Sequence, residues 1–266
     1  MQDLTVIKVG GAIVEDEARL SRLLDDFAKI QGAKVLVHGG GRRATKVAAA
    51  LGIETKMVAG RRVTDANMLE VVTMVYGGLV NKNIVARLQG RGVNALGLTG
   101  ADMNVIRSHQ RPPVKVDNPD KGSSELVDYG FVGDVDFVDG QALATLINQR
   151  VTPVMAPLTH DCQGHLLNTN ADTIAAETAK ALAPFFNVTL VYCFEKPGVL
   201  ANPDDDASVI PSITRKDFEA LVADGTVSGG MRPKLENALV AVESGVKRVV
   251  ITKADAIGTD AGTVIH

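Results

Sequence analysis

Short apolar runs alternate with longer amphipathic stretches along this chain, almost from its first residue. Leu4–Val9 is mostly β-branched and stops at Gly10-Gly11, which predicts a buried strand that ends in a turn. Glu15–Ile30 follows with apolar residues at helical spacing. Further strands are predicted at Lys34–Val37, Ala95–Leu98, Val151–Ala156, Val188–Tyr192 and Arg248–Thr252. Further helices are predicted at Arg42–Leu51, Ala66–Gln89, Gly140–Asn148, Asp172–Leu182, Lys216–Ala223 and Pro233–Ser244. This alternation predicts an α/β fold whose mainly parallel sheet is covered on both faces.

Two regions interrupt the alternation. Ala59–Asp65 is polar and basic, which predicts a hairpin or loop before a long helix. His109–Asp139 is rich in Pro, Gly and Asp and shows period-two alternation, which predicts an antiparallel excursion. Neither region resembles a flexible linker, so we expect two lobes that fold as one unit.

The composition excludes several classes of function. The 266 residues carry a net charge of −3, which gives no general attraction to nucleic acid or to an anionic membrane surface. No apolar stretch approaches the ~20 residues that cross a bilayer, and no signal peptide opens the chain. Cys162 and Cys193 do not form a CxxC pair. A cytoplasmic protein is therefore expected, and any anionic ligand needs local cations and backbone N–H groups.

Two glycine runs follow the first two predicted strands. Gly10-Gly11 and Gly39–Gly41 would lie together at the carboxyl edge of the sheet, where α/β proteins bind ligands. Glycines there let the backbone approach an anion closely. Lys8, two residues before the first run, would place a cation beside them, although an edge-strand lysine that reaches water has the same sequence signature. Neither G-x-G-x-x-G nor G-x-x-x-x-G-K-[ST] occurs, which disfavours a dinucleotide oxidoreductase and a P-loop NTPase.

Three further segments carry polar residues typical of a ligand site. Asn168 and Asn170 lie two residues apart and would project to the same side, where they could hold a small polar ligand. Asn170 or Asp172 could instead cap the helix that follows. Lys234 lies in the first turn of a predicted helix, a position that the helix dipole disfavours unless an anion is bound.

Arg61-Arg62, before the long helix, could fork onto a substrate carboxylate. A solvated basic turn explains this pair equally well.

The motifs taken together resemble one family. KVGG, VHGGG, GRRVTD, LNTNAD and GMRPKLENA occur in this order along nearly the whole chain, and the set resembles the acetylglutamate kinases of the amino-acid kinase family. The resemblance implies a three-layer αβα sandwich with a carbamate kinase-like fold. It also implies a single kinase domain over 1–266, with an N-terminal lobe (about 1–175) for the acyl-amino acid and dimerisation and a C-terminal lobe (about 176–266) for ATP.

The resemblance also implies roles for individual residues. Lys8 and Lys234 would neutralise the transferring phosphoryl group, and Asp172 would orient both lysines by pairing with them. Substrate-binding roles are implied for Gly40, Gly41, Arg62, Asn168 and Asn170. Nucleotide or phosphate contacts are implied for Gly10, Gly11, Gly39, Glu195, Gly198 and Gly230. The cofactor would be ATP with Mg²⁺ carried by the nucleotide, and no residue is assigned as a metal ligand.

The implied reaction explains the choice of residues. A carboxylate acceptor is already ionised near pH 7, so phosphoryl transfer to it needs charge neutralisation and alignment but no general base.

The segment Tyr192–Val199 departs from the usual family pattern, with Glu195 where an Asp is common, and resembles a branch associated with N-succinyl instead of N-acetyl substrates. The sequence leaves these two acyl groups open. It also leaves open a kinase with another amino-acid acceptor and a non-catalytic nucleotide or amino-acid sensor.

The long helix Ala66–Gln89 is more apolar than one face requires, and we expect it at a homodimer interface. Its apolar positions include Met68, Val71, Val72, Met74 and Val75. A role in the core alone is the alternative. Arginine-inhibited members of the family carry an additional N-terminal helix, whereas this chain begins just before its first strand, so the resemblance implies a plain homodimer.

Overall fold

A central eight-stranded sheet organises the computed structural model, which describes residues 1–118, 123–229, 231–259 and 261–266. The strand order is β14-β16-β15-β13-β1-β2-β10-β5. The strands are β1 (Asp3–Val9), β2 (Ala33–His38), β5 (Ala95–Leu98), β10 (Thr152–Met155), β13 (Asn187–Phe194), β14 (Ser212–Ile213), β15 (Arg248–Lys253) and β16 (Thr263–Ile265). All neighbours pair in parallel except β15 and β16. The mainly parallel sheet that the sequence predicts is confirmed.

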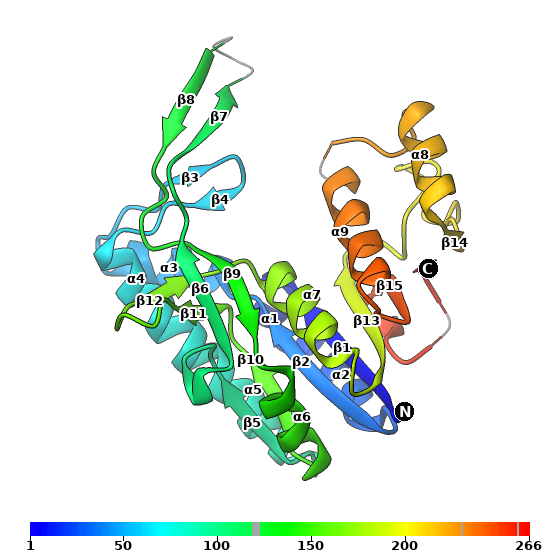
Figure 1. The fold of residues 1–266 in the computed structure, drawn as a ribbon, viewed down its shortest axis with the longest axis horizontal. Helices are drawn as coiled ribbons and strands as arrows, with labels where there is room; N and C mark the ends of the chain where they lie inside the picture. Colours follow the sequence, from blue (N-terminus) through cyan, green and yellow to red (C-terminus); the bar gives the residue numbers. More distant parts are fainter. Residues whose placement is uncertain (119–122, 230, 260) are drawn as a thin grey trace.

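Helices cover both faces of this sheet (Figure 1). They are α1 (Gly11–Glu15), α2 (Glu17–Lys29), α3 (Gly41–Ala50), α4 (Ala66–Val72), η1 (Thr73–Val80), α5 (Asn81–Gln89), α6 (Gly140–Asn148), α7 (Ala171–Leu182), α8 (Arg215–Ala223) and α9 (Met231–Glu243). Alternate residues of β1 enter two separate cores: Leu4 and Val6 pack with α6, α7 and α9, whereas Ile7 and Val9 pack with α2, α3, α4 and α5. The molecule is therefore a three-layer αβα sandwich. Within the described ranges, no helix is long and apolar enough to cross a membrane.

The antiparallel excursion is confirmed as well. A four-stranded sheet has the order β12-β11-β6-β9, and two hairpins, β3–β4 and β7–β8, project on the same side of the molecule (Figure 1). These strands are β3 (Met57–Val58), β4 (Arg61–Arg62), β6 (Ile106–Gln110), β7 (Val114–Asn118), β8 (Ser123–Val127), β9 (Gly133–Val138), β11 (Leu158–His160) and β12 (Leu166–Asn168). A small core that includes Tyr129 and Val132 packs against Val58 of one hairpin and Val114 of the other.

Two predicted helices differ from the observed ones. Glu15–Ile30 is interrupted at Asp16, whose side chain accepts a hydrogen bond from the Arg19 N–H at 2.9 Å and caps α2. Ala66–Gln89 is continuous, but its middle third, η1, is a π-helix. The spacing of apolar residues indicated a helix but not which backbone hydrogen bonds close its turns, so it did not reveal the π segment.

Candidate active site

The two glycine turns meet at the carboxyl edge of the sheet, where β1 and β2 lie side by side. A Cβ atom added to Gly39 would lie 3.1 Å from the backbone nitrogen of Gly11, and one added to Gly11 would lie 3.6 Å from that of Gly41. The N–H of Gly39 donates to the Val9 carbonyl at 2.9 Å, which fixes one turn to the other. A Cβ atom on Gly39 would crowd the Gly11 backbone, whereas the 3.6 Å at Gly11 is an ordinary van der Waals contact. The close approach of the two turns brings several N–H groups together.

Lys8 and Asp172 form an ion pair beside these turns. Lys8 Nζ lies 2.8 Å from Asp172 Oδ1, and the two side chains are 11% and 34% exposed. Lys8 comes from β1, which lies between β13 and β2 in the middle of the sheet. The alternative of an edge-strand lysine is therefore wrong. Asp172 lies in the first turn of α7, where a carboxylate also complements the helix dipole.

Lys234 approaches the same space from the first turn of α9. Its Nζ lies 4.3 Å from the centroid of the Phe194 ring, a cation–π contact. No ion pair joins Lys234 to Asp172 in the part of the chain that the structure describes, so Asp172 pairs with Lys8 and not with both lysines.

Two adjoining cavities share Lys8. One, of about 480 Å³, is lined by both lysines and by Gly10, Gly11, Gly41, Phe194, Glu195, Gly198 and Met231, among others. The other, of about 250 Å³, is lined by Lys8, Gly39, Gly40, Gly41, Arg61, Arg62, Tyr76, Asn168, Asn170 and Asp172, among others. All the residues expected to bind the acyl-amino acid line the second cavity. Because Lys8 and Gly41 line both, molecules in the two cavities would meet at the Lys8 ammonium group.

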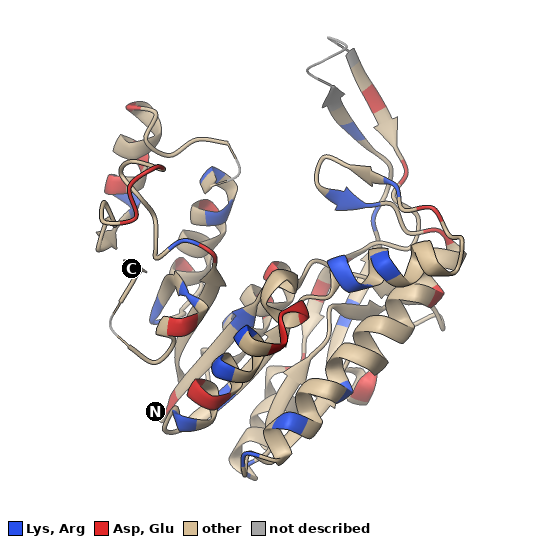
Figure 2. Ribbon diagram, turned by 180° about the vertical axis from the view of Figure 1, so that it is seen from behind, with Lys and Arg blue, Asp and Glu red and all other residues tan. Residues whose placement is uncertain are grey.

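Arg62 connects the β3–β4 hairpin to the second glycine turn. Its Nη2 donates to the Gly41 carbonyl and to Thr45 Oγ1, each at 2.9 Å, and its Nη1 donates to Thr55 Oγ1 at 3.3 Å. The basic residues of α3 and β4 gather at this end of the molecule (Figure 2). Arg62 thus uses several of its N–H groups in hydrogen bonds that hold the cavity wall together. Arg61 lines the same cavity.

The two asparagines have different local roles. Asn168 Nδ2 donates to Thr64 Oγ1 at 3.0 Å, which joins β12 to the segment after β4. Asn170 Oδ1 accepts from the Asp172 N–H at 2.7 Å and caps α7. The capping alternative is therefore observed for Asn170, although both asparagines line the cavity.

Tyr76 was not identified from the sequence. It comes from η1 and packs against Gly40, where an added Cβ would lie only 2.7 Å from the ring. Burial raises the pKa of Tyr76, and the neighbouring Arg62 guanidinium partly offsets this shift. The only signal in the sequence was one aromatic residue within an otherwise aliphatic stretch.

Glu195 and Gly198, which the sequence predicts to contact the nucleotide, both line the larger cavity. Glu195 Oε1 lies 3.9 Å from Arg42 Nη2 at the exposed mouth of the larger cavity. A Cβ on Gly198 would lie 2.8 Å from Thr263 Oγ1, so packing against β16 already requires glycine there. Gly230 lies outside the described residues.

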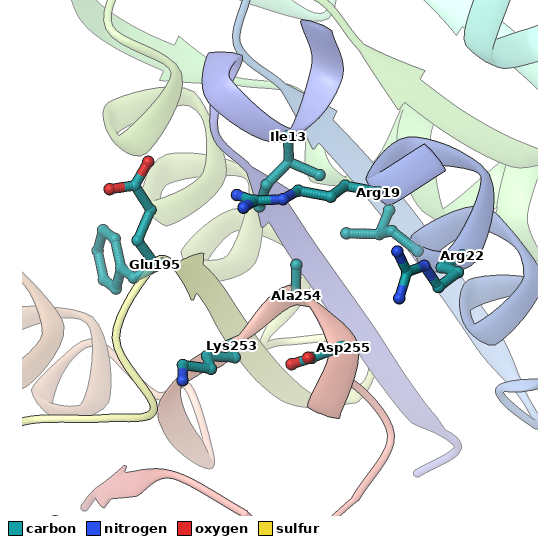
Figure 3. A pocket seen from close by; sticks show the side chains of 9 residues that line it. Ile13, Arg19, Arg22, Glu195, Lys253, Ala254 and Asp255 are labelled. Carbon is teal, nitrogen blue, oxygen red and sulfur yellow. The ribbon is translucent and has the colours of Figure 1, made fainter. Parts of the chain in front are cut away.

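A third cavity, of about 370 Å³, borders the larger one and shares Ile13, Phe194 and Glu195 with it. Figure 3 shows Arg19 and Arg22 on one side of it and Lys253 and Asp255 on the other. Arg19 already pairs with Asp16 at 3.4 Å, and Lys253 pairs with Asp206 at 3.1 Å. Among the described residues, no three His, Cys, Asp or Glu side chains gather as a metal cluster.

Comparison with known proteins places this geometry in a family. Residues 3–253 match the model of the amino acid kinase family. The acetylglutamate kinase of Bacteroides thetaiotaomicron is 67% identical over 264 residues, 99% of this chain and 98% of that protein. A solved Streptococcus mutans protein, smu.665, is 30% identical with a TM-score of 0.73 and 98% of each chain covered. The carbamate kinase of Giardia shares the fold at 16% identity, with a TM-score of 0.66 over 99% of this chain and 98% of that one.

Proposed function

This chain belongs to the amino acid kinase family, and we propose that it transfers the γ-phosphoryl group of ATP to the side-chain carboxylate of an N-acylglutamate at Lys8. The enzyme is a phosphotransferase with a carboxyl acceptor, of the acetylglutamate kinase type, and acts in arginine biosynthesis. The observation that carries the residue assignment is the position of Lys8 at the junction of two cavities. One cavity has the polar lining that suits an amino-acid derivative, and the other has the glycines and second lysine that suit a nucleotide.

The chemistry follows from this arrangement. The acceptor carboxylate is ionised near neutral pH and attacks phosphorus without a base, whereas the transferring group carries negative charge that repels it. Lys8, Lys234 and the glycine N–H groups reduce this repulsion and hold the acceptor and the phosphoryl group in line.

Asp172 acts on the reaction through Lys8. The ion pair at 2.8 Å fixes the ammonium group at the junction, where it meets both reactants. Two lysines around one carboxylate leave a net positive charge in the cleft, which favours the polyphosphate of ATP. We propose that Mg²⁺ enters with the nucleotide, since kinases hold this ion largely through substrate phosphates.

The two lobes divide the substrates in this proposal. The residues that line the smaller cavity all fall between Lys8 and Asp172, within the lobe at about 1–175. The larger cavity adds Cys193–Lys196, Gly198, Met231 and Lys234 from the lobe at about 176–266. We therefore place N-acylglutamate in the first lobe and ATP in the second, and we expect the enzyme to work in the cytoplasm.

A hydroxamate assay tests the proposal. The purified protein is incubated with ATP, Mg²⁺ and hydroxylamine, and acetylglutamate, succinylglutamate, glutamate and aspartate are offered in turn. The acyl phosphate product should appear as hydroxamate with an acylated glutamate and not with the free amino acids. Absence of hydroxamate from both acylated glutamates would contradict the proposed function, and the better of the two identifies the acyl group.

We also propose that the enzyme is a homodimer. Most apolar residues of the long helix, including Met68, Val71 and Val75, pack in the chain's own core. Met74 and Leu79 remain 52% and 48% exposed on η1. Residues five apart lie on one face of a π-helix, so these two side chains form a single apolar strip. A second copy of the same strip would cover it across a twofold axis.

A further inference from the structure

A buried polar network lies directly behind the second glycine turn. His38, the last residue of β2, is fully buried and lines neither of the two adjoining cavities. Its Nδ1 lies 3.0 Å from the Gly39 carbonyl oxygen, and its Nε2 lies 3.1 Å from Asn81 Nδ2. A carbonyl oxygen can only accept, so Nδ1 carries the proton and donates to it. The amide of Asn81 then donates to Nε2, which fixes the neutral tautomer of the ring.

Asn81 connects this histidine to three other elements. It is the first residue of α5, and its Nδ2 also donates to the Val154 carbonyl of β10 at 2.9 Å. Its Oδ1 accepts from Lys82 Nζ at 3.2 Å. Gly97 of β5 leaves the required space, since a Cβ there would lie 1.8 Å from Asn81 Oδ1. Every polar atom of the Asn81 side chain is therefore committed to holding position.

Burial keeps His38 uncharged, against the opposing effect of its hydrogen bond to Gly39. Burial lowers its pKa to about 4, and the charge of Lys82 adds to this effect. A neutral, fully enclosed imidazole is unsuited to proton transfer with a substrate at pH 7. The ring can still donate a hydrogen bond, and its Nδ1–H group points at the backbone of the glycine turn.

The hydrogen bond to Gly39 determines where the next N–H group points. In a trans peptide, the C=O of one residue and the N–H of the next point in opposite directions. Because the Gly39 carbonyl is held toward the buried His38, the N–H of Gly40 points away from it. The Gly40 nitrogen lies 3.7 Å from the Cβ position of Gly11, on the side of the first glycine turn. Glycine peptides rotate at little steric cost, so Gly39–Gly40 needs an external restraint to keep this orientation.

We propose that His38 is a positioning residue, which acts through the Gly39–Gly40 peptide to aim the Gly40 N–H at the transferring phosphoryl group. Asn81 holds His38 in the tautomer that this task requires. The inference rests on the proposed function for its catalytic consequence, and on the hydrogen bonds of His38 and Asn81 for its structural content.

Two matched substitutions distinguish a positioning role of His38 from an effect on the stability of the protein. In His38→Asn, the side-chain amide can occupy the place of Nδ1 and still donate to Gly39. In His38→Gln, the amide group reaches the place of Nε2, contacts Asn81 and leaves Gly39 without a donor. We expect His38→Gln to lower kcat by about 10²-fold with KM values little changed, since loss of one aligned backbone donor costs about that much. His38→Asn should stay within about threefold of the wild-type kcat. Equal kcat values in the two variants, or a loss confined to KM, would overturn the proposal.

A second measurement uses the wild-type protein and does not depend on enzyme activity. In wild-type protein labelled with ¹⁵N-histidine, His38 should give the neutral Nδ1–H tautomer throughout the range from about pH 5 to pH 8. In protein labelled with ¹⁵N-glycine, the Gly40 amide resonance should shift when Mg²⁺ and a non-hydrolysable ATP analogue that keeps the γ-phosphoryl group are added. A protonated or Nε2–H imidazole, or an unresponsive Gly40 amide, would contradict the inference. If the hydroxamate assay fails while these signals appear, the proposed reaction is wrong and the positioning role stands.

Discussion

At the scale of single residues, the main electrostatic feature of the site is the balance of charge among three side chains. Lys8 and Asp172 neutralise each other, whereas Lys234 rests on the Phe194 ring with its charge uncompensated by a carboxylate among the described contacts. The cleft therefore has a surplus of positive charge before any substrate enters. Phosphoryl transfer uses such a surplus in the transition state, where negative charge spreads over the equatorial oxygens.

Replacing either lysine should affect the chemical step more than substrate binding. We expect Lys8→Ala and Lys234→Ala each to lower kcat by about 10²- to 10³-fold, with smaller changes in KM, because each removes charge stabilisation that is strongest in the transition state. Steady-state kinetics with both substrates provides the measurement. Lys29→Ala, on the exposed face of α2, serves as the control and should leave both constants unchanged. A rise in KM with kcat unchanged would mean that the lysines act only in binding.

His38 should make stability depend on pH in a defined window. Its pKa is about 4 in the folded protein and 6.5 in the reference state, so the unfolded chain binds the proton first as the pH falls. The free energy of unfolding should therefore decrease between about pH 6.5 and pH 4, by at most about 1.4 kcal/mol per pH unit. Above this window, His38 is neutral in both states and contributes no slope. Urea unfolding across the window should show a shallower slope for His38→Asn than for the wild type.

The long helix α4–η1–α5 combines three tasks at the scale of the element. Its π segment places Tyr76 against Gly40, its next residue, Asn81, holds His38, and Met74 and Leu79 face outward. A π segment often marks a functional site because its wider turn shifts the register of the side chains that follow. One helix thus links the proposed dimer surface to the wall of the substrate cavity.

A charge on the exposed strip of this helix should separate the subunits. We expect Leu79→Glu to convert the dimer to a monomer, because the twofold axis would place two carboxylates in an apolar contact. Sedimentation velocity at several concentrations measures the change. Leu126→Glu provides the control, since Leu126 is 65% exposed on β8, away from η1. A wild-type protein that is monomeric at all concentrations, or a Leu79→Glu variant that stays dimeric, would rule out this interface.

At the scale of the whole molecule, a single sheet joins the two lobes that we propose. β1 pairs along its whole length with β13 of the C-terminal lobe and over six residues with β2 of the N-terminal lobe. Neither lobe can unfold without exposing the backbone of this buried strand. The two cavities lie on either side of the junction and meet at Lys8, which β1 itself supplies.

Thermal unfolding should consequently be one cooperative transition. We expect scanning calorimetry to give a single peak whose van't Hoff and calorimetric enthalpies agree within error. Two resolved peaks would show that the lobes are independent domains. As a comparison, a saturating nucleotide should move the entire transition upward, because a ligand that binds only the folded state stabilises the cooperative unit as a whole.

The sequence by itself determined the architecture and indicated the residues that we propose for the site. Alternating apolar runs specified the parallel sheet, since each strand must bury both faces, and the glycines after β1 and β2 marked the edge where a ligand binds. Lys8 and Lys234 were singled out because each would place a cation where an anion could bind, and the resemblance to acetylglutamate kinases implied their roles and that of Asp172. Each of these signals lies within a short stretch of sequence, so it can be recognised without knowing which distant residues pack against it.

Tertiary structure decided which partner each side chain contacts. Asn170 caps α7, Lys234 rests on Phe194 and Asp172 pairs with Lys8. Tyr76 against Gly40 and Asn81 against His38 join residues that are 36 and 43 positions apart. No local pattern encodes such contacts, because they depend on the packing of distant elements. The sequence therefore determined which groups the site contains, and packing decided their orientation.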